Sequence, residues 1–184
     1  MLRVLVPLAQ GCEELEAVTI IDLLVRAEID VVTASLDDQH LIQCSRGVVL
    51  QAQTSLSEVL NQAFDMVVLP GGQPGSDNLA ADERLLELLR RTVESGGISA
   101  AICAATKVLK AAGLLDGLKA TSYPDVLDKH PAQNMIYVNE TVVDSGSIVT
   151  SRGPGAAMDF ALHLIERLKG IESRTKVEAA LVRA

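Results

Sequence analysis

Short apolar runs alternate with helical patterns along most of the chain. Apolar runs bounded by turn residues are typical of buried strands, whereas apolar residues that recur about every three to four positions are typical of amphipathic helices. The runs predict strands at residues 3–8, 30–35, 65–69 and 98–102, shorter strands at 120–122, 135–138, 141–143 and 148–151, and a small hairpin at 42–50. The helical patterns cover residues 13–26, 55–60, 82–94, 104–112, 154–168 and 172–182.

This alternation predicts an α/β fold. Strands joined through helices pair in parallel, and such sheets are covered by helices on both faces. No repeat, low-complexity stretch or linker interrupts the pattern, so residues 1–184 are expected to form a single domain. Ligands of these sheets bind beyond the carboxyl ends of the strands. Chemically unusual residues follow several of these ends: Gly11, Cys12, Gly71, Gly72, Cys103, Arg152 and Gly153.

Cys103 stands where a predicted strand passes directly into a predicted helix. Its neighbours, among them Ala104 and Ala105, are small, and a sharp turn crowded by larger side chains would not close. Free backbone N–H groups and the positive dipole end of a helix favour a thiolate at such a position. The pattern indicates a nucleophile elbow with Cys in place of Ser. The alternative is an inert cysteine that packs as a small hydrophobe.

Composition and charge narrow the function classes. Of the 184 residues, 48% are hydrophobic, which allows a sizeable core and excludes a disordered chain. The formal net charge of −8 disfavours a nucleic-acid-binding surface. No apolar stretch reaches the length of a membrane helix, and residues 1–8 are too short and too strand-like for a signal peptide.

The cysteines and histidines argue against metal binding. The chain has three cysteines, at Cys12, Cys44 and Cys103. They are widely spaced, odd in number and form no C-x-x-C pair, which disfavours a disulfide framework and a zinc site and indicates a reducing cytoplasm. His40, His130 and His163 have no histidine or cysteine partner at ligand spacing, so no metal is expected.

Two other kinds of site find little support. Gly153 and Gly155 could begin a dinucleotide fingerprint, but Met158 takes the place of its third glycine, and the chain has no G-x-x-x-x-G-K-[ST] run. A Cys–His–acid triad needs a histidine within reach of the sulfur. Alanine directly follows Cys103, and His130 is only a loose candidate.

Three acidic residues, Glu13, Glu14 and Glu16, open the helix that follows the first strand. A carboxyl group beside a thiolate works only when it is protonated, because two negative charges repel each other. A raised carboxyl pKa and a lowered thiol pKa would therefore make an acid–nucleophile pair. The alternative, expected for most of the three residues, is a helix-capping acid at the surface.

Backbone and arginine donors complete the candidate site. Gly71 and Gly72 follow a core strand and could direct backbone N–H groups toward the elbow as an oxyanion hole. An ordinary glycine turn after a strand explains them equally well. Arg46 and Arg152 could bind an anion or form surface ion pairs.

Several segments together resemble the ThiJ/PfpI/DJ-one superfamily. They are Gly11-Cys12-Glu13-Glu14-Leu15-Glu16-Ala17-Val18, Cys44-Ser45-Arg46, Leu69-Pro70-Gly71-Gly72, Ala100-Ala101-Ile102-Cys103-Ala104 and Thr150-Ser151-Arg152-Gly153-Pro154-Gly155. The segments occur in the family's order along essentially the whole chain, and this co-occurrence is more specific than any one of them. Within the superfamily the chain looks closest to the DJ-one branch and its bacterial YajL-like members.

The resemblance implies a flavodoxin-like three-layer α/β sandwich with a mainly parallel sheet. It also implies that Cys103 is the reactive, easily oxidised cysteine of the elbow. Glu16 takes the place of the family's protonated glutamate, which bonds this thiolate. Gly71 and Gly72 match the positions of the backbone donors.

The resemblance further implies a homodimer. Arg46 and Arg152 match arginines near the dimer interface and the pocket of the site. The first helix is the expected dimer contact, with Ile20, Leu23 and Leu24 partly spare from core packing.

Tyr123 departs from the family pattern. Human-type members have a histidine near the cysteine, in a segment where this chain has Thr121-Ser122-Tyr123-Pro124. Tyrosine is a poor general base near neutral pH because its unperturbed pKa is about 10, although it can donate a hydrogen bond, and bacterial members also carry an aromatic residue here. A protease-like triad is therefore not expected, and proton transfer is left to Glu16.

The resemblance implies an enzyme that needs neither a metal nor an organic cofactor, of the glyoxalase or deglycase type. The Cys103 thiolate would add to the aldehyde of a small dicarbonyl such as methylglyoxal, or to its early adducts on protein side chains. Glu16 would move a proton between carbon and oxygen, and N–H groups near Gly72 and Ala104 would stabilise the oxyanion. The product would be a 2-hydroxy acid.

Two other functions stay open. Stepwise oxidation of the same cysteine toward sulfinic acid would suit an oxidative-stress sensor or a redox-regulated chaperone. The historical family label suggests a role near thiamine (thiazole) biosynthesis, but no residue here indicates a thiazole or phosphate site.

Overall fold

A seven-stranded sheet organises the computed structural model, which describes residues 1–183. The strand order is β10-β11-β7-β6-β1-β2-β5, and only the pairing of β10 with β11 is antiparallel. The strands are β1 (Arg3–Leu8), β2 (Asp30–Ser35), β5 (Thr54–Ser55), β6 (Met66–Leu69), β7 (Ile98–Ile102), β10 (Val142–Asp144) and β11 (Ile148–Ser151). Two small sheets lie outside it, the hairpin of β3 (Leu41–Gln43) with β4 (Val49–Gln51) and the parallel pair of β8 (Lys119–Ala120) with β9 (Ile136–Tyr137).

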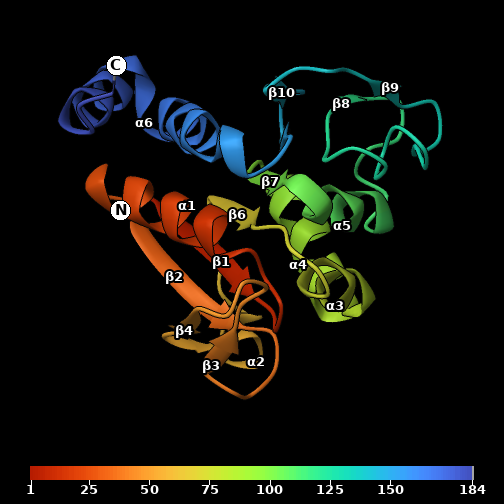
Figure 1. Ribbon diagram of the computed structural model, residues 1–184, viewed down its shortest axis with the longest axis horizontal. Coiled ribbons are helices and arrows are strands. Elements are labelled where there is room, and N and C mark those ends of the chain that lie inside the picture. Colours follow the sequence, from red (N-terminus) through yellow and green to blue (C-terminus); the bar gives the residue numbers. More distant parts are fainter. Residues whose placement is uncertain (184) are drawn as a thin grey trace.

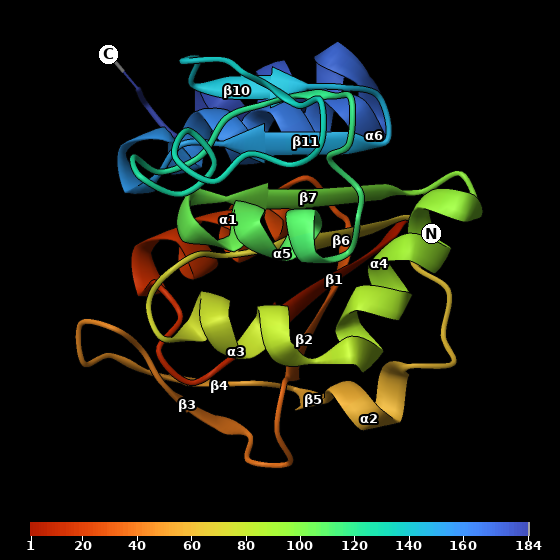
Figure 2. The same ribbon diagram turned by 90° about the vertical axis from the view of Figure 1, so that its right-hand side faces the viewer.

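Helices cover both faces of the sheet, which gives the three layers of a flavodoxin-like fold (Figures 1 and 2). One face is covered by α1 (Glu14–Arg26) and α6 (Ala157–Ala180), which pack against each other. The helices of the other layer are α2 (Leu56–Val59), α3 (Gly75–Ala81), α4 (Glu83–Glu94) and α5 (Thr106–Ala111). The α/β fold class predicted from the sequence is confirmed.

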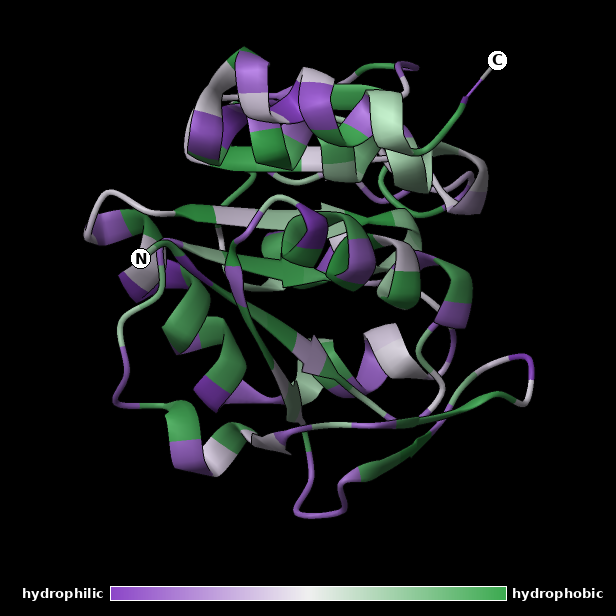
Figure 3. Ribbon diagram, turned by 90° about the vertical axis from the view of Figure 1, so that its left-hand side faces the viewer, coloured by the Kyte–Doolittle hydropathy of each residue, from purple (hydrophilic) through white to green (hydrophobic). Residues whose placement is uncertain are grey.

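Each central strand contributes to two cores, because successive side chains point to opposite faces of a sheet. In β1, Val4 and Val6 join the cluster that contains Ile20 of α1 and Phe160 of α6, whereas Leu5 joins the cluster of the other helices. The strands are accordingly mostly hydrophobic, and hydrophilic residues are frequent on the outer helices (Figure 3). Burial on both faces explains why the strands are continuous apolar runs in the sequence.

Most element boundaries follow local signals. The Asp82 carboxylate caps α4 by accepting hydrogen bonds from the N–H groups of Arg84 and Leu85. The prediction of two C-terminal helices, over 154–168 and 172–182, is confirmed, because the backbone of α6 leaves the helical conformation at Gly170 (φ 83°, ψ 171°), which divides it into two helices at the predicted gap. Helix α3 was not predicted.

The expected dimer residues of the first helix are also misplaced. Ile20, Leu23 and Leu24 are buried in the core of the chain and are not spare. The exposed apolar side chains of α1 are instead Leu15, Val18 and Val25. Within residues 1–183, no helix combines the length and hydrophobicity that a membrane span needs.

Candidate active site

Cys103 lies at the carboxyl end of β7, where the strand passes through a single 3-10 turn (Cys103–Ala105) into α5. Its φ of 62° falls in the left-handed region that side chains rarely adopt. Ser151 of β11 is in register with Ile102, so Arg152 and Cys103 leave neighbouring strands at the same edge of the sheet. The predicted cysteine elbow is confirmed.

Glu16 reaches the elbow from the first turn of α1. The residue is fully buried, and its Oε2 accepts a hydrogen bond of 2.7 Å from the N–H of Gly71. A Cβ atom built on Gly71 would lie 2.7 Å from both Cys103 Cβ and Glu16 Oε2. Gly71 therefore lies against both the acid and the cysteine, and only glycine fits there because any side chain would overlap them.

Burial governs the ionisation of this pair. It raises the pKa of Glu16 to about 7, although the Gly71 N–H favours the carboxylate. Burial, and then the negative charge of Glu16, raise the pKa of Cys103 to about 12, while the N–H groups of Ala104 and Gly72 act in the opposite direction. The raised carboxyl pKa agrees with the prediction. The prediction that the pKa of the thiol is lowered is wrong, because the sulfur is buried beside an ionisable acid.

Between these two values the pair holds one proton in common, since the first leaves near pH 7 and the second only near pH 12. When that proton is on Glu16, the carboxyl group no longer repels a thiolate and becomes a hydrogen-bond donor. The N–H groups of Gly72 and Ala104 then face a Cys103 thiolate. This form of the pair combines a nucleophile with an adjacent acid.

Gly72 lies directly against the backbone of the loop that precedes α1. Its φ is 95°, and a Cβ atom there would lie 2.4 Å from the backbone N of Glu13 and 2.7 Å from the carbonyl carbon of Cys12. Glycine is therefore required both by the backbone conformation and by the close approach of the loop. The same loop is held by the N–H of Glu13, which donates to the carbonyl of Gly71 at 2.8 Å.

Tyr123 and Arg152 lie at the same edge of the sheet as the cysteine. The Tyr123 N–H donates to the Cys103 carbonyl at 3.4 Å, its side chain is about half exposed, and a Cβ atom on Gly153 would lie 3.2 Å from its ring. Arg152 is half-buried, and its Nε is buried without a hydrogen-bond partner among residues 1–183. Both therefore lie at the edge of the sheet that holds the elbow, and their binding roles stay predictions.

Arg46 is placed differently. It lies exposed in the turn between β3 and β4, and its backbone N–H donates to the Glu14 carboxylate at 3.0 Å. This carboxylate also accepts from the N–H of Val48 and the hydroxyl of Ser45, so Glu14 anchors the hairpin on the start of α1. The contact that ties Arg46 to this region is thus made by its backbone.

The three acids therefore have three different roles, and the expectation that most of them are surface caps is wrong. Only Glu13 caps α1, with its carboxylate accepting from the Glu16 N–H at 2.7 Å. Glu14 is buried under the hairpin, and Glu16 is buried at the elbow. The anchoring role of Glu14 was missed, because nothing local in the sequence predicts that the hairpin folds back over α1.

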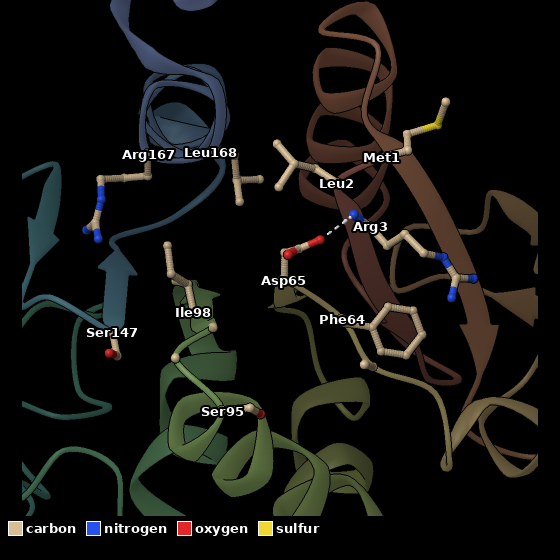
Figure 4. A pocket seen from close by; sticks show the side chains of 13 residues that line it. Met1, Leu2, Arg3, Phe64, Asp65, Ser95, Ile98, Ser147, Arg167 and Leu168 are labelled. Carbon is tan, nitrogen blue, oxygen red and sulfur yellow. Dashed lines mark hydrogen bonds between the residues drawn. The ribbon is translucent and has the colours of Figure 1, made fainter.

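A separate pocket of about 630 Å³ opens at the opposite edge of the sheet (Figure 4). Its walls include Arg3, Phe64 and Ile98, and the Arg3 N–H donates to the Asp65 carboxylate at 2.7 Å. Ile98 is the first residue of β7 and Cys103 follows the last, so the length of the strand separates the pocket from the elbow. Its lining contains no cysteine or histidine.

A metal centre finds no support in the part of the chain that the structure describes. No three His, Cys, Asp or Glu side chains gather there in a group that could hold an ion. His163, on α6, instead forms an ion-pair contact of 2.7 Å with Asp144.

The sheet topology and the strained cysteine elbow define a flavodoxin-like α/β protein with a candidate thiol site at the carboxyl edge of its sheet. The chain belongs to the DJ-1/PfpI family, whose family model matches residues 2–167.

Individual relatives match over nearly the whole chain. "Protein dj-1beta" of Drosophila melanogaster is 42% identical over 179 residues, which cover 97% of this chain and 95% of that protein. The structure titled "Toxoplasma gondii DJ-1, oxidized" has 42% identity and a TM-score of 0.95 and covers all of both chains. A protein of Caenorhabditis elegans named "Glutathione-independent glyoxalase DJR-1.2" is 36% identical over 163 residues, which cover 89% of this chain and 86% of that protein. Similarity to the YajL-like members in particular stays a prediction.

Proposed function

We propose that this protein is a cofactor-free, cysteine-dependent enzyme that converts small reactive dicarbonyls, such as methylglyoxal, or their early adducts on protein side chains, into 2-hydroxy acids. The observation that carries the proposal is the buried Glu16 carboxyl beside Cys103, with its pKa raised to about 7. Such an acid can give up and regain a proton at neutral pH. The name of the Caenorhabditis elegans relative supports the same reaction class.

The reaction would begin with addition of the Cys103 thiolate to the aldehyde carbon. A C–S bond forms, the carbonyl electron pair moves onto oxygen, and the N–H groups of Gly72 and Ala104 stabilise the developing charge. Glu16 protonates this oxygen and gives a hemithioacetal. The Glu16 carboxylate then removes the proton from the former aldehyde carbon, which gives an enediolate, and returns it to the neighbouring carbon. The hydroxyl proton of the hemithioacetal moves to the oxygen of that neighbouring carbon, so that a thioester of the 2-hydroxy acid forms. Water hydrolyses this thioester, breaks the C–S bond and releases the 2-hydroxy acid and the free Cys103 thiol.

Two further side chains would bind the substrate at this edge. The half-exposed Tyr123 can donate its hydroxyl hydrogen to the second carbonyl group of a dicarbonyl. Arg152, whose Nε has no partner among residues 1–183, can hold the product carboxylate. Substitution of either residue should raise KM more than it lowers kcat.

A second function, oxidative-stress sensing or redox-regulated chaperoning, would use the same cysteine. It is favoured by the donors around Cys103, because a sulfinate would accept hydrogen bonds from the protonated Glu16 and from Gly72. The relative from Toxoplasma gondii was solved in a form described as oxidized. Limited peroxide followed by intact-mass analysis tests this function, and the absence of oxygen addition at Cys103 would count against it.

We propose a homodimer in the cytoplasm as the working form. A groove of about 420 Å³ is lined by Val18, Ile21 and Val25 of α1 and by Leu50 of β4. It includes two of the exposed apolar side chains of α1, Val18 and Val25, and a second copy of the chain would cover it. The three thiols are free, which suits a reducing compartment.

The enzyme proposal is tested by measuring methylglyoxal consumption and lactate formation. Wild type should form lactate, and Cys103→Ser should lose turnover by several orders of magnitude, because a hydroxyl is a far weaker nucleophile at neutral pH. Cys44→Ser, which removes another buried thiol, serves as the matched control and should retain turnover. Full turnover by a folded Cys103→Ser variant would reject the proposal.

A further inference from the structure

Cys12 and Cys44 form a second thiol site, separate from the elbow. Their Sγ atoms are 3.6 Å apart, although the residues lie 32 positions apart in the chain. Both are buried, Cys12 completely and Cys44 with 5% of its surface exposed. The sequence spacing disfavoured disulfides, but the fold brings these two thiols into direct contact.

The backbone on either side holds the two cysteines at the spacing of paired strands. The N–H of Gly11 donates to the carbonyl of Gln43 at 2.7 Å, and the N–H of Ser45 donates to the carbonyl of Cys12 at 2.8 Å. Cys44 therefore lies directly opposite the Gly11–Cys12 segment. Paired strands lie about 4.8 Å apart, and the Cα atoms of a disulfide lie about 4.4–6.8 Å apart. Backbone segments joined by such hydrogen bonds therefore lie at about the separation that a disulfide needs.

The Glu14 carboxylate reinforces this arrangement. It comes from the segment that contains Cys12 and accepts hydrogen bonds from Ser45 and Arg46, which directly follow Cys44. Because Glu14 is buried, these bonds resist separation of the two segments. To form the bond, the two sulfur atoms must approach from 3.6 Å to about 2.05 Å.

We propose that Cys12 and Cys44 form a reversible intramolecular disulfide, a redox modification site that is distinct from Cys103. The oxidant is a hydroperoxide. Cys44, the more accessible sulfur, attacks the O–O bond, releases an alcohol and becomes a sulfenic acid. Cys12 then attacks this sulfur, the S–S bond forms, the S–O bond breaks and water leaves. Two thiols and one hydroperoxide give one disulfide, one alcohol and one water.

The buried environment of the two thiols makes this reaction slow. Burial raises the pKa of both thiols, and the negative charge of Glu14 adds to that effect, so little thiolate is present at neutral pH. The disulfide should therefore accumulate under sustained oxidant exposure and be reversed by a dithiol reductant. It does not depend on the proposed enzyme reaction, because neither of these two thiols takes part in that mechanism.

The test uses the full chain with Cys103→Ala, which leaves only the thiol pair. The folded protein is treated with diamide, which removes two hydrogen atoms per disulfide, and is then unfolded, alkylated with N-ethylmaleimide and weighed. We expect the number of alkyl groups to fall from two to zero and to return to two after dithiothreitol, with a peptide map linking the Cys12 and Cys44 segments. The matched control, Cys103→Ala with Cys44→Ser, should keep its single alkyl group.

Three results would overturn the proposal. They are two alkyl groups after diamide on the folded variant, a link between two chains in place of the internal one, and a disulfide that forms only in urea. If Cys103→Ala does not fold by circular dichroism, peptide mapping of diamide-treated wild type decides the question. A Cys12–Cys103 or Cys44–Cys103 link there, without a Cys12–Cys44 link, would equally reject the assigned pair.

Discussion

The Glu16 carboxyl and the Cys103 thiol meet in one buried site, and both lie against Gly71. One group comes from the first turn of α1 and the other from the end of β7. Each changes the ionisation of the other, because a charge on Glu16 raises the pKa of Cys103. The relationship makes the two residues a single acid–nucleophile unit, and its consequences are measurable.

The alkylation rate of Cys103 should rise with pH around an apparent pKa near 7 and then level off. The reason is that the singly protonated pair, which includes the thiolate beside a protonated Glu16, forms as the first proton leaves near pH 7. In Glu16→Gln the step near pH 7 should disappear, because the amide has no proton to release. Iodoacetamide labelling followed by peptide mass spectrometry measures both profiles, and an unchanged profile in Glu16→Gln would contradict the coupling.

Wild type should lose stability as the pH rises from about 4.5 to about 7, relative to Glu16→Gln. Burial raises the pKa of Glu16 from 4.5 to about 7, so the folded state binds the proton more tightly than the unfolded state does. The contribution is fully present below the unfolded pKa, falls through this window and is flat above it. A shift of this size corresponds to roughly 3 kcal/mol. Urea unfolding across the window measures it, and parallel curves for the two proteins would count against it.

Cys103→Gly should be more stable than Cys103→Ala by about 1 kcal/mol, because glycine relieves the left-handed backbone at this position. Within a strand or helix a glycine variant is usually less stable than an alanine variant, because glycine loses more conformational entropy on folding. Ala101→Gly in β7 provides the control and should destabilise the protein. Urea unfolding of the three variants decides the matter, and an alanine variant as stable as the glycine variant would show that the elbow is unstrained.

Gly71→Ala should destabilise the protein by roughly 1–3 kcal/mol, because the new methyl group overlaps Cys103 Cβ and Glu16 Oε2. It should also abolish the step near pH 7 in Cys103 alkylation, since the acid and the thiol are pushed apart. Gly155→Ala is the matched control, because a Cβ atom there meets nothing within 4 Å. Equal unfolding curves for the two variants would contradict the close approach at Gly71.

Val18→Asp should convert the proposed dimer into a monomer, because it places a charge in the apolar groove between α1 and β4. Light scattering at a series of concentrations measures the mass. Glu28→Gln, at an exposed position after α1, provides a control that should stay dimeric. A monomeric wild type, or a Val18→Asp variant that remains a dimer, would reject the proposal that this groove forms the dimer interface.

Much of the fold could be predicted because its signals are local. The run at residues 98–102 and the small residues after it predicted both β7 and the turn at Cys103. Asp82 and Gly96 marked the limits of α4 through capping and a positive φ. Helix α3 was not predicted, because it is short and begins after Pro74 without a side-chain cap.

The same distinction between local and long-range signals applies to the candidate site. The sequence by itself determined the elbow, its glycine neighbours and the presence of acids at the start of α1, because strand runs, turn glycines and helix ends depend on adjacent residues. Only the tertiary structure decided which acid faces Cys103, that Glu14 holds the hairpin, that the pKa of the thiol is raised, and that Cys12 touches Cys44. These properties depend on burial and on the distance between segments far apart in the chain, and the packing of α1, the hairpin and β7 fixes both.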